Sequence, residues 1–367
     1  MAVPQFARWL AALFGVLLVL VAAQSVIATV ITPRPTANTL TRQIDRVVNL
    51  GFRAATSRVS EYARRDRILS AQAATVLLGQ LVVWLVLFYV GYSLLLWPLV
   101  DGGITNAFST AGPALWAVGD VNEHGAPERA VLDIAALTSL ITVTLQIAYL
   151  PTLYSAFNHR ETQVALLNAR AGTPAWGPEL LARTHYGLGS GTSTIGTLPQ
   201  LYENWEQWSA DIAESHTTYP TLVRFRSPKP LSSWVTALLA VLDSAALLLA
   251  LSPSQAPIVP ARLCLRGGFL CLQEIATTMG LPITAESESA GVGLTYADFI
   301  DAVTRLQEVG FPIERDPKEA WPDFAGWRIN YGRAAYAIAE SIDAPPALWS
   351  GPRRFPGEPI APIRPSL

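Results

Sequence analysis

The stretch AQAATVLLGQLVVWLVLFYVGYSLLLWPLV, residues 71–100, contains no charged side chain. About 20 apolar residues are enough for a helix to cross the hydrocarbon core of a membrane. Trp84 and Trp97 are suited to anchor such a helix at the membrane interface. Two further segments have the same character: residues 9–31 carry no charge, and residues 130–157 carry only Asp133, near one end. The sequence therefore predicts three transmembrane helices.

The composition agrees with a membrane protein. Of the 367 residues, 51% are hydrophobic and 15% are charged, whereas soluble domains carry about 25% charged residues. The net charge of −2 gives no basic field, so we expect no nucleic-acid partner. The only two cysteines, Cys264 and Cys271, cannot make a disulfide framework. We interpret both as small buried hydrophobic side chains.

Residues 233–251 are a fourth apolar segment of spanning length, but Asp243 lies at its centre. An acid in the middle of a span costs about 2.5–3.5 kcal/mol on insertion scales. The three predicted spans contain no arginine, lysine or histidine that would pair with it. We predict that this segment is the buried helix of a soluble domain, and a fourth span is the alternative.

The charges of the loops predict the orientation. Residues 33–72 hold eight arginines against three acidic residues, and residues 101–129 hold one arginine against four acidic residues. Because basic loops stay in the cytoplasm, we expect the first loop inside and the second outside. The N-terminus is then outside and the C-terminal region is in the cytoplasm. We expect the protein in the inner (plasma) membrane of the cell. A signal peptide cut after Ala23 is the alternative, but it would export the arginine-rich loop.

The loop between the second and third predicted spans is unusually apolar. Residues 104–118 are mostly small and apolar, Asn106 is a candidate helix cap, and Gly119 and Asp120 follow. A short apolar helix that enters the membrane and returns is tolerated only where protein buries it or where it lines water. The pattern predicts a re-entrant helix between two spans, which is the plan of a cation-channel pore.

At these residues the chain resembles the bacterial potassium-channel-like membrane proteins. The resemblance rests on residues 108–112 (FSTAG), on 114–120 (ALWAVGD) and on the inner-helix exit 148–154 (AYLPTLY), with Arg160 and Glu161 beyond it. A potassium filter reads TVGYGD, and only Gly119 and Asp120 match its end. The resemblance implies a homotetramer in the lipid bilayer that conducts monovalent cations. The alternative is that the loop lies outside the cell and does not conduct. The protein would then be a membrane anchor whose cytosolic domain binds a protein partner.

The predicted fold is therefore an all-α membrane protein with three transmembrane helices and a re-entrant pore-like helix, followed by a soluble, mostly helical C-terminal domain. Its predicted parts are an N-terminal transmembrane helix (1–32), a cytoplasmic arginine-rich amphipathic helix (33–72), a pore-like module (73–157), a cytoplasmic helical domain (158–344) and a proline- and arginine-rich tail (345–367). In the C-terminal region we expect helices at residues 160–171, 199–216, 231–251, 261–279, 296–309 and 326–342.

Two sets of residues are the candidates for an ion path. The pore and filter candidates are Thr110, Leu115, Trp116, Ala117, Val118, Gly119 and Asp120. The inner-helix candidates Thr138, Thr142 and Gln146 recur at four-residue steps and form one polar stripe, which lines water or joins helices by hydrogen bonds.

No pattern for catalysis or cofactor binding stands out. The four histidines have no cysteine or histidine at ligand spacing, so we expect no metal site. The glycine-rich residues 187–196 lack the Gly-Lys-Thr ending of a nucleotide loop, and we interpret them as a linker. Ser215 and His216, close to Asp211, imitate a hydrolase set, but a triad needs side chains from separate elements. We predict neither a cofactor nor an enzymatic activity.

Overall fold

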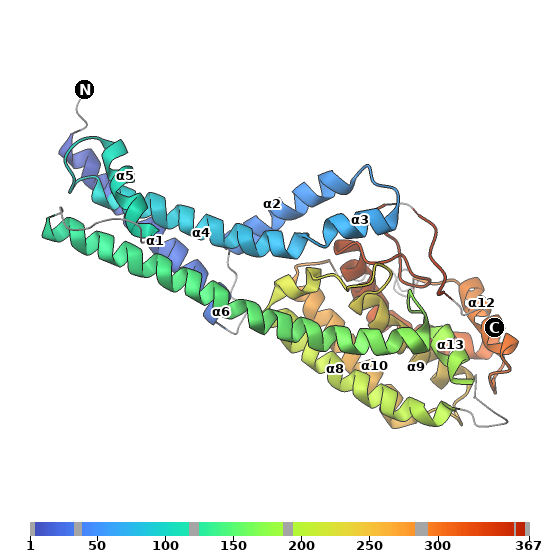
Figure 1. The fold of residues 1–367 in the computed structure, drawn as a ribbon. Coiled ribbons are helices and arrows are strands. Elements are labelled where there is room, and N and C mark those ends of the chain that lie inside the picture. The colour runs from blue at the N-terminus through green and yellow to red at the C-terminus, as the bar shows by residue number, and fades with distance from the viewer. Residues whose placement is uncertain are drawn as a thin grey trace. The chain divides into compact units, whose positions relative to one another are not determined.

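In the computed structural model of this chain, the regular elements of the described part are helices joined by loops, with no β-sheet there (Figure 1). It describes residues 4–32, 39–116, 125–185, 194–282, 293–355 and 357–363. The chain divides into two compact units. Unit 1 comprises Met1–Ala54 and Ala71–Tyr154, and unit 2 comprises Ala55–Ser70 and Ser155–Leu367.

Unit 1 contains long helices with apolar surfaces. Its helices are α1 (Gln5–Val26), which continues as one π-helical turn (Ile27–Ile31), α2 (Thr39–Thr56), α4 (Gln72–Leu96), α5 (Ile104–Leu115) and the first part of α6 (Ala126–Ala171). Their outward side chains are large and hydrophobic, such as Leu13 on α1, Leu78 on α4 and Leu140 on α6. Such a surface suits lipid and would be unfavourable in water.

Helices α1 and α4 lie against each other through small residues. A Cβ atom on Gly15 would lie 2.5 Å from the carbonyl oxygen of Gly91, so neither helix tolerates a side chain at this crossing. Small residues allow two membrane helices to approach closely, where van der Waals contacts and hydrogen bonds hold them. One such bond joins the Trp84 indole, which donates to the Ser25 hydroxyl over 2.9 Å.

Unit 2 is a helical bundle around one central helix. Its helices are α3 (Tyr62–Leu69), the last part of α6, α7 (Gly177–His185), α8 (Leu198–Thr218), α9 (Trp234–Leu251), α10 (Ile258–Thr278), α12 (Tyr296–Glu308) and α13 (Pro317–Ser341). Helices α7, α8, α10 and α13 all pack on α9. Almost every residue of α9 is buried, and α9 supplies the middle of the largest hydrophobic core.

Asp243, the acid at the centre of α9, is fully paired inside this bundle. Both Arg328 and Tyr331 of α13 donate hydrogen bonds to its carboxylate, the tyrosine over 2.9 Å. Arg328 also donates to the Tyr336 hydroxyl and to the carbonyl of Trp349. Buried charges are tolerated when they are paired and hydrogen-bonded in this way.

Among the described residues, four helices are long and apolar enough to cross a membrane, as in a multi-pass membrane protein. Three of them overlap the predicted spans, and α6 continues beyond the predicted end of the third span. The fourth is α9, whose apolar window is 94% buried within the described part of the chain.

Several element boundaries differ from the sequence prediction. The arginine-rich segment is interrupted after Thr56, so that it forms α2 and α3, and α3 belongs to unit 2. Asn106 was expected to cap the short loop helix, but α5 begins at Ile104 and the Asn106 amide donates to the carbonyl of Asp101. Helix α13 begins nine residues earlier than predicted, because Asp316 caps it and Pro317 fits its first position. Helix α7 was not predicted.

Candidate functional site

Helix α5 is the short helix expected in the loop between two spans. It packs on α4: the Tyr89 hydroxyl donates to the carbonyl of Phe108, and the two rings meet edge to face with centroids 5.3 Å apart. At its C-terminal end, the Ser139 hydroxyl of α6 donates to the carbonyl of Leu115 over 2.6 Å. Ser139 lies six residues beyond Asp133, about 9 Å along the helix. The end of α5 is therefore level with an uncharged part of α6.

The predicted filter residues fall partly on α5. The Thr110 hydroxyl donates to the carbonyl of Asn106 in its own helix. Leu115 is buried, whereas Trp116 is 62% exposed. The other filter candidates, Ala117, Val118, Gly119 and Asp120, lie outside the described residues.

The polar stripe on α6 is turned toward the chain's own helices. Thr138 shares a hydrogen bond of 2.8 Å with the Tyr92 hydroxyl of α4. Thr142 is buried and donates to the carbonyl of Thr138, and Gln146 is buried too. The exposed side chains on this part of α6 are mostly apolar, namely Ile134, Leu137, Leu140, Ile141 and Ile147, with Asp133 and Thr144 among them.

Two buried amides in unit 1 lack partners among the described residues. Neither polar atom of Gln80 has a hydrogen bond, and the Gln146 carbonyl oxygen also has none. The Tyr92–Thr138 contact sets the register of α4 against α6, which run in opposite directions. Gln80 lies twelve residues before Tyr92 on α4, and Gln146 lies eight residues after Thr138 on α6. Because the helices are antiparallel, both residues lie on the same side of the Tyr92–Thr138 contact, separated along the helix axes by about one turn. An unpaired buried amide costs about 1–3 kcal/mol, so these two groups stand out among the buried polar side chains of unit 1. Sequence analysis missed Gln80, although a glutamine well inside an uncharged span was a visible signal.

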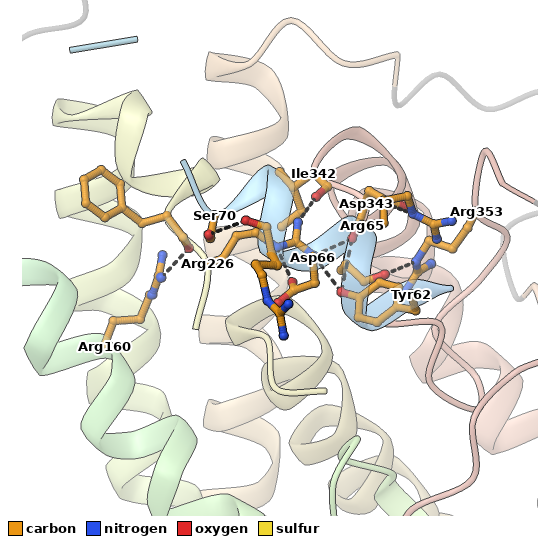
Figure 2. Close-up of polar contacts among 12 residues, drawn as sticks. Tyr62, Arg65, Asp66, Ser70, Arg160, Arg226, Ile342, Asp343 and Arg353 are labelled. Carbon is orange, nitrogen blue, oxygen red and sulfur yellow. Dashed lines mark hydrogen bonds and ion pairs between the residues drawn. The ribbon is translucent and has the colours of Figure 1, made fainter. Parts of the chain in front are cut away.

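In unit 2, charged side chains from three distant segments converge on α3 (Figure 2). Arg65 donates to the Asp343 carboxylate over 2.6 Å, and Asp66 is paired with Arg226. Arg226 also donates to the Tyr62 hydroxyl and to the carbonyl of Asp343. We call this group, with Arg353, the α3 cluster. The sequence did not reveal it, because its ion pairs join residues 160 and 278 positions apart.

Burial shapes the ionisation of the α3 cluster. Loss of water raises the pKa of the Tyr62 hydroxyl, which therefore stays protonated. Burial lowers the pKa of Arg353 to about 10, so this side chain is still charged at neutral pH. Arg353 binds the carbonyls of Ala344 and Pro345. The cluster is thus a set of fixed charges that holds the residues after α13 against α3.

A small, shallow cleft that is partly open to solvent lies beside the α3 cluster. Its walls come from the residues before α9 and from those after α13. The lining residues are Val223, Arg224, Phe225, Arg226, Ser227, Ser232, Ser233, Ile342, Ala344 and Pro345.

Ser215 and His216, which resemble two members of a hydrolase triad, are in contact. The Ser215 hydroxyl lies 3.0 Å from Nδ1 of His216, but Nε2 of the same ring accepts a hydrogen bond from Arg160. A triad needs a carboxylate in that second position. Asp211 instead lies 3.1 Å from His159. Burial, together with the neighbouring Arg160 charge, holds the pKa of His216 well below its usual range, so the ring is neutral.

Comparison with known proteins adds no further guide to the site. No protein-family model, curated protein or solved structure matches this chain. The α5 region in unit 1 and the α3 cluster with its cleft in unit 2 are therefore interpreted from their own geometry.

Proposed function

We propose that this chain is an integral membrane protein in which α1, α4 and α6 cross the bilayer and anchor unit 2 in the cytoplasm as a binding module. The observation that carries the proposal is the α3 cluster. Its ion pairs join α3 to Arg226, which precedes α9, and to Asp343, which follows α13.

These ion pairs bear on the number of spans. Helix α9 lies between Arg226 and Asp343 in the chain, and no later described helix is a candidate span. If α9 crossed the membrane once, the two residues would lie on opposite sides, yet both bind α3. The pairing of Asp243 with Arg328 and Tyr331 supports the same conclusion, because a protein interior offers these partners and lipid does not.

Charge supports the cytoplasmic side. The arginine-rich residues around α3 belong to unit 2 and directly precede the span α4. Because arginines flanking a span stay inside, we place unit 2 in the cytoplasm and the N-terminus outside.

The inward polar stripe favours an anchor over a conducting pore. In an axial pore between identical chains, the lining side chains are exposed in each separate chain. Thr142 and Gln146 are buried instead, and Thr138 is bonded to Tyr92. The Thr142 hydroxyl makes a hydrogen bond within α6, and the Thr138 hydroxyl makes one to α4. Hydrogen bonds between membrane helices are worth about 0.6–2 kcal/mol each.

A flux assay tests the anchor. Purified protein in liposomes is expected to leak potassium or sodium no faster than empty liposomes, with gramicidin as the positive control. A cation leak that disappears in the Ala117→Trp variant would contradict the anchor and support conduction.

Cation conduction by a homotetramer is the second candidate, and the position of α5 favours it. The C-terminal end of α5 carries a partial negative charge, and it lies level with an uncharged part of α6. One such loop in each chain closes a pore only in a cyclic assembly. Particles with four-fold symmetry, together with the Ala117-dependent leak, would establish this candidate. A monomer in native nanodiscs would exclude it.

A further inference from the structure

We propose that the cleft beside the α3 cluster binds a phosphate-type anion, either a free phosphate group or the phosphate of a lipid headgroup. The inference rests on unsatisfied polar groups, on the local charge and on the start of α9, all within unit 2.

Two serines that line the cleft have hydroxyls without a hydrogen-bond partner among the described residues. Ser233 is 8% exposed, lines the cleft and is the N-cap residue of α9, but its hydroxyl makes no capping bond and no other hydrogen bond among the described residues. The Ser227 hydroxyl also lines the cleft and is buried with no partner there. N-cap serines normally bond to the first turn of their helix. A hydroxyl that forgoes this bond is available to a ligand.

The start of α9 adds donors. Helix α9 has 18 residues and begins at Trp234, next to the cleft wall formed by Ser232 and Ser233. The first backbone N–H groups of a helix have no partner within the helix, and the helix dipole makes this end attractive to anions. Together these features form a common type of phosphate site in proteins.

The charges around the cleft are positive in balance. Arg224 and Arg226 line it, and Arg65 and Arg353 lie in the adjoining α3 cluster, whereas the acids nearby are Asp66, Asp343 and, close to Arg353, Glu340. Four guanidinium groups against three carboxylates leave one positive charge in excess, which an anion would neutralise.

Arg226 links the proposed anion site to the packing of α3. It lines the cleft, and it also holds Asp66 and Tyr62 of α3, the helix that precedes the span α4. An anion bound there would therefore change the interactions of Arg226 that hold α3 within unit 2.

Thermal unfolding of the full chain in nanodiscs tests the site. In phosphatidylcholine nanodiscs, inorganic phosphate is expected to raise the unfolding midpoint by about 2–4 °C relative to chloride at equal ionic strength. Nanodiscs containing phosphatidic acid form the second arm. A shift with inorganic phosphate identifies a soluble anion, and a shift only with phosphatidic acid identifies a lipid headgroup. No shift in either arm would overturn the proposal.

Two variants show whether the shift comes from this cleft. Ser233→Asp places a carboxylate where the anion would bind, so it is expected to raise the midpoint without phosphate and to abolish the response to phosphate. Thr295→Asp, the matched change at the N-cap of α12, is expected to keep the response. Arg224→Gln is expected to weaken the apparent affinity about tenfold. A response that is unchanged in both Ser233→Asp and Arg224→Gln would overturn the proposal.

Discussion

Helices α1 and α9 are both long enough and apolar enough to cross a membrane, but their surroundings differ. The apolar window of α1 is 28% buried within the described chain, and that of α9 is 94% buried. Helix α1 packs on α4 through Gly15, while α9 is surrounded by α7, α8, α10 and α13. The comparison teaches that hydropathy identifies apolar helices but does not say what surrounds them. The pairing of Asp243 with Arg328 and Tyr331 is what indicates that α9 belongs to a protein core.

Removing the partner of Asp243 should have the largest effect. Arg328→Met leaves a buried carboxylate with only Tyr331 as a donor, and breaking a buried pair in this way costs about 3–5 kcal/mol. We expect a matching loss in the free energy of unfolding of unit 2, measured by chemical denaturation in detergent.

The double variant Asp243→Leu with Arg328→Met is the control. Because it removes both charges, it should recover most of the lost stability. Equal destabilisation by the single and double variants would show that the ion pair is not what makes α9 a core helix.

The next effect concerns the close approach of α7 to α9. A Cβ atom on Gly177 would lie 2.8 Å from the carbonyl oxygen of Ala240, and α9 is enclosed and cannot move away. Gly177→Ala should therefore cost about 1–3 kcal/mol of unit 2 stability. Gly326→Ala on α13 is the matched control, because a Cβ atom there meets nothing within 4 Å. That variant should raise stability by up to about 1 kcal/mol, and two equal losses would refute the packing argument.

Most of the helices could be predicted from the sequence, because apolar runs and helical periodicity are local signals. The helices of the three predicted spans and helices α8, α10 and α12 follow from such patterns. The candidate site could not be predicted in the same way. Arg65 and Arg226 look like ordinary topology-setting or surface charges until the fold brings Asp343 and Asp66 to them. The orientation of the polar stripe on α6 was also ambiguous, since a periodic pattern defines a face but does not say what covers it.

Acid should weaken unit 2 through His216, whose ring lies 5.3 Å from that of Trp234 at the start of α9. Its pKa is lower in the folded chain than in the unfolded chain, so below about pH 6.5 the unfolded chain binds more protons. Stability should then fall by about 1–2 kcal/mol between pH 7 and pH 5.

Unfolding measured across this pH range tests the assignment. His216→Gln should flatten the pH profile, whereas His159→Gln, a change at an exposed histidine, should leave it in place. The reverse pattern would assign the acid sensitivity to His159.

The smallest effect is expected at the crossing of α1 and α4. Gly15→Ala produces a contact closer than that at Gly177, 2.5 Å from the Gly91 carbonyl oxygen. However, α1 is packed mainly on one side and can shift into lipid, so we expect a loss of only about 1 kcal/mol. Calorimetry of the reconstituted protein measures it. A loss larger than that of Gly177→Ala would mean that α1 is the more constrained helix.

The side of the membrane on which the chain ends tests most directly the claim that α9 is a core helix. Green fluorescent protein and alkaline phosphatase, fused separately after Leu367 of the full chain, report the cytoplasm and the periplasm respectively. With three spans and the N-terminus outside, the account predicts a fluorescent first fusion and an inactive second one. An active phosphatase with no fluorescence would mean that α9 crosses the membrane and that the ion pairs of the α3 cluster do not form.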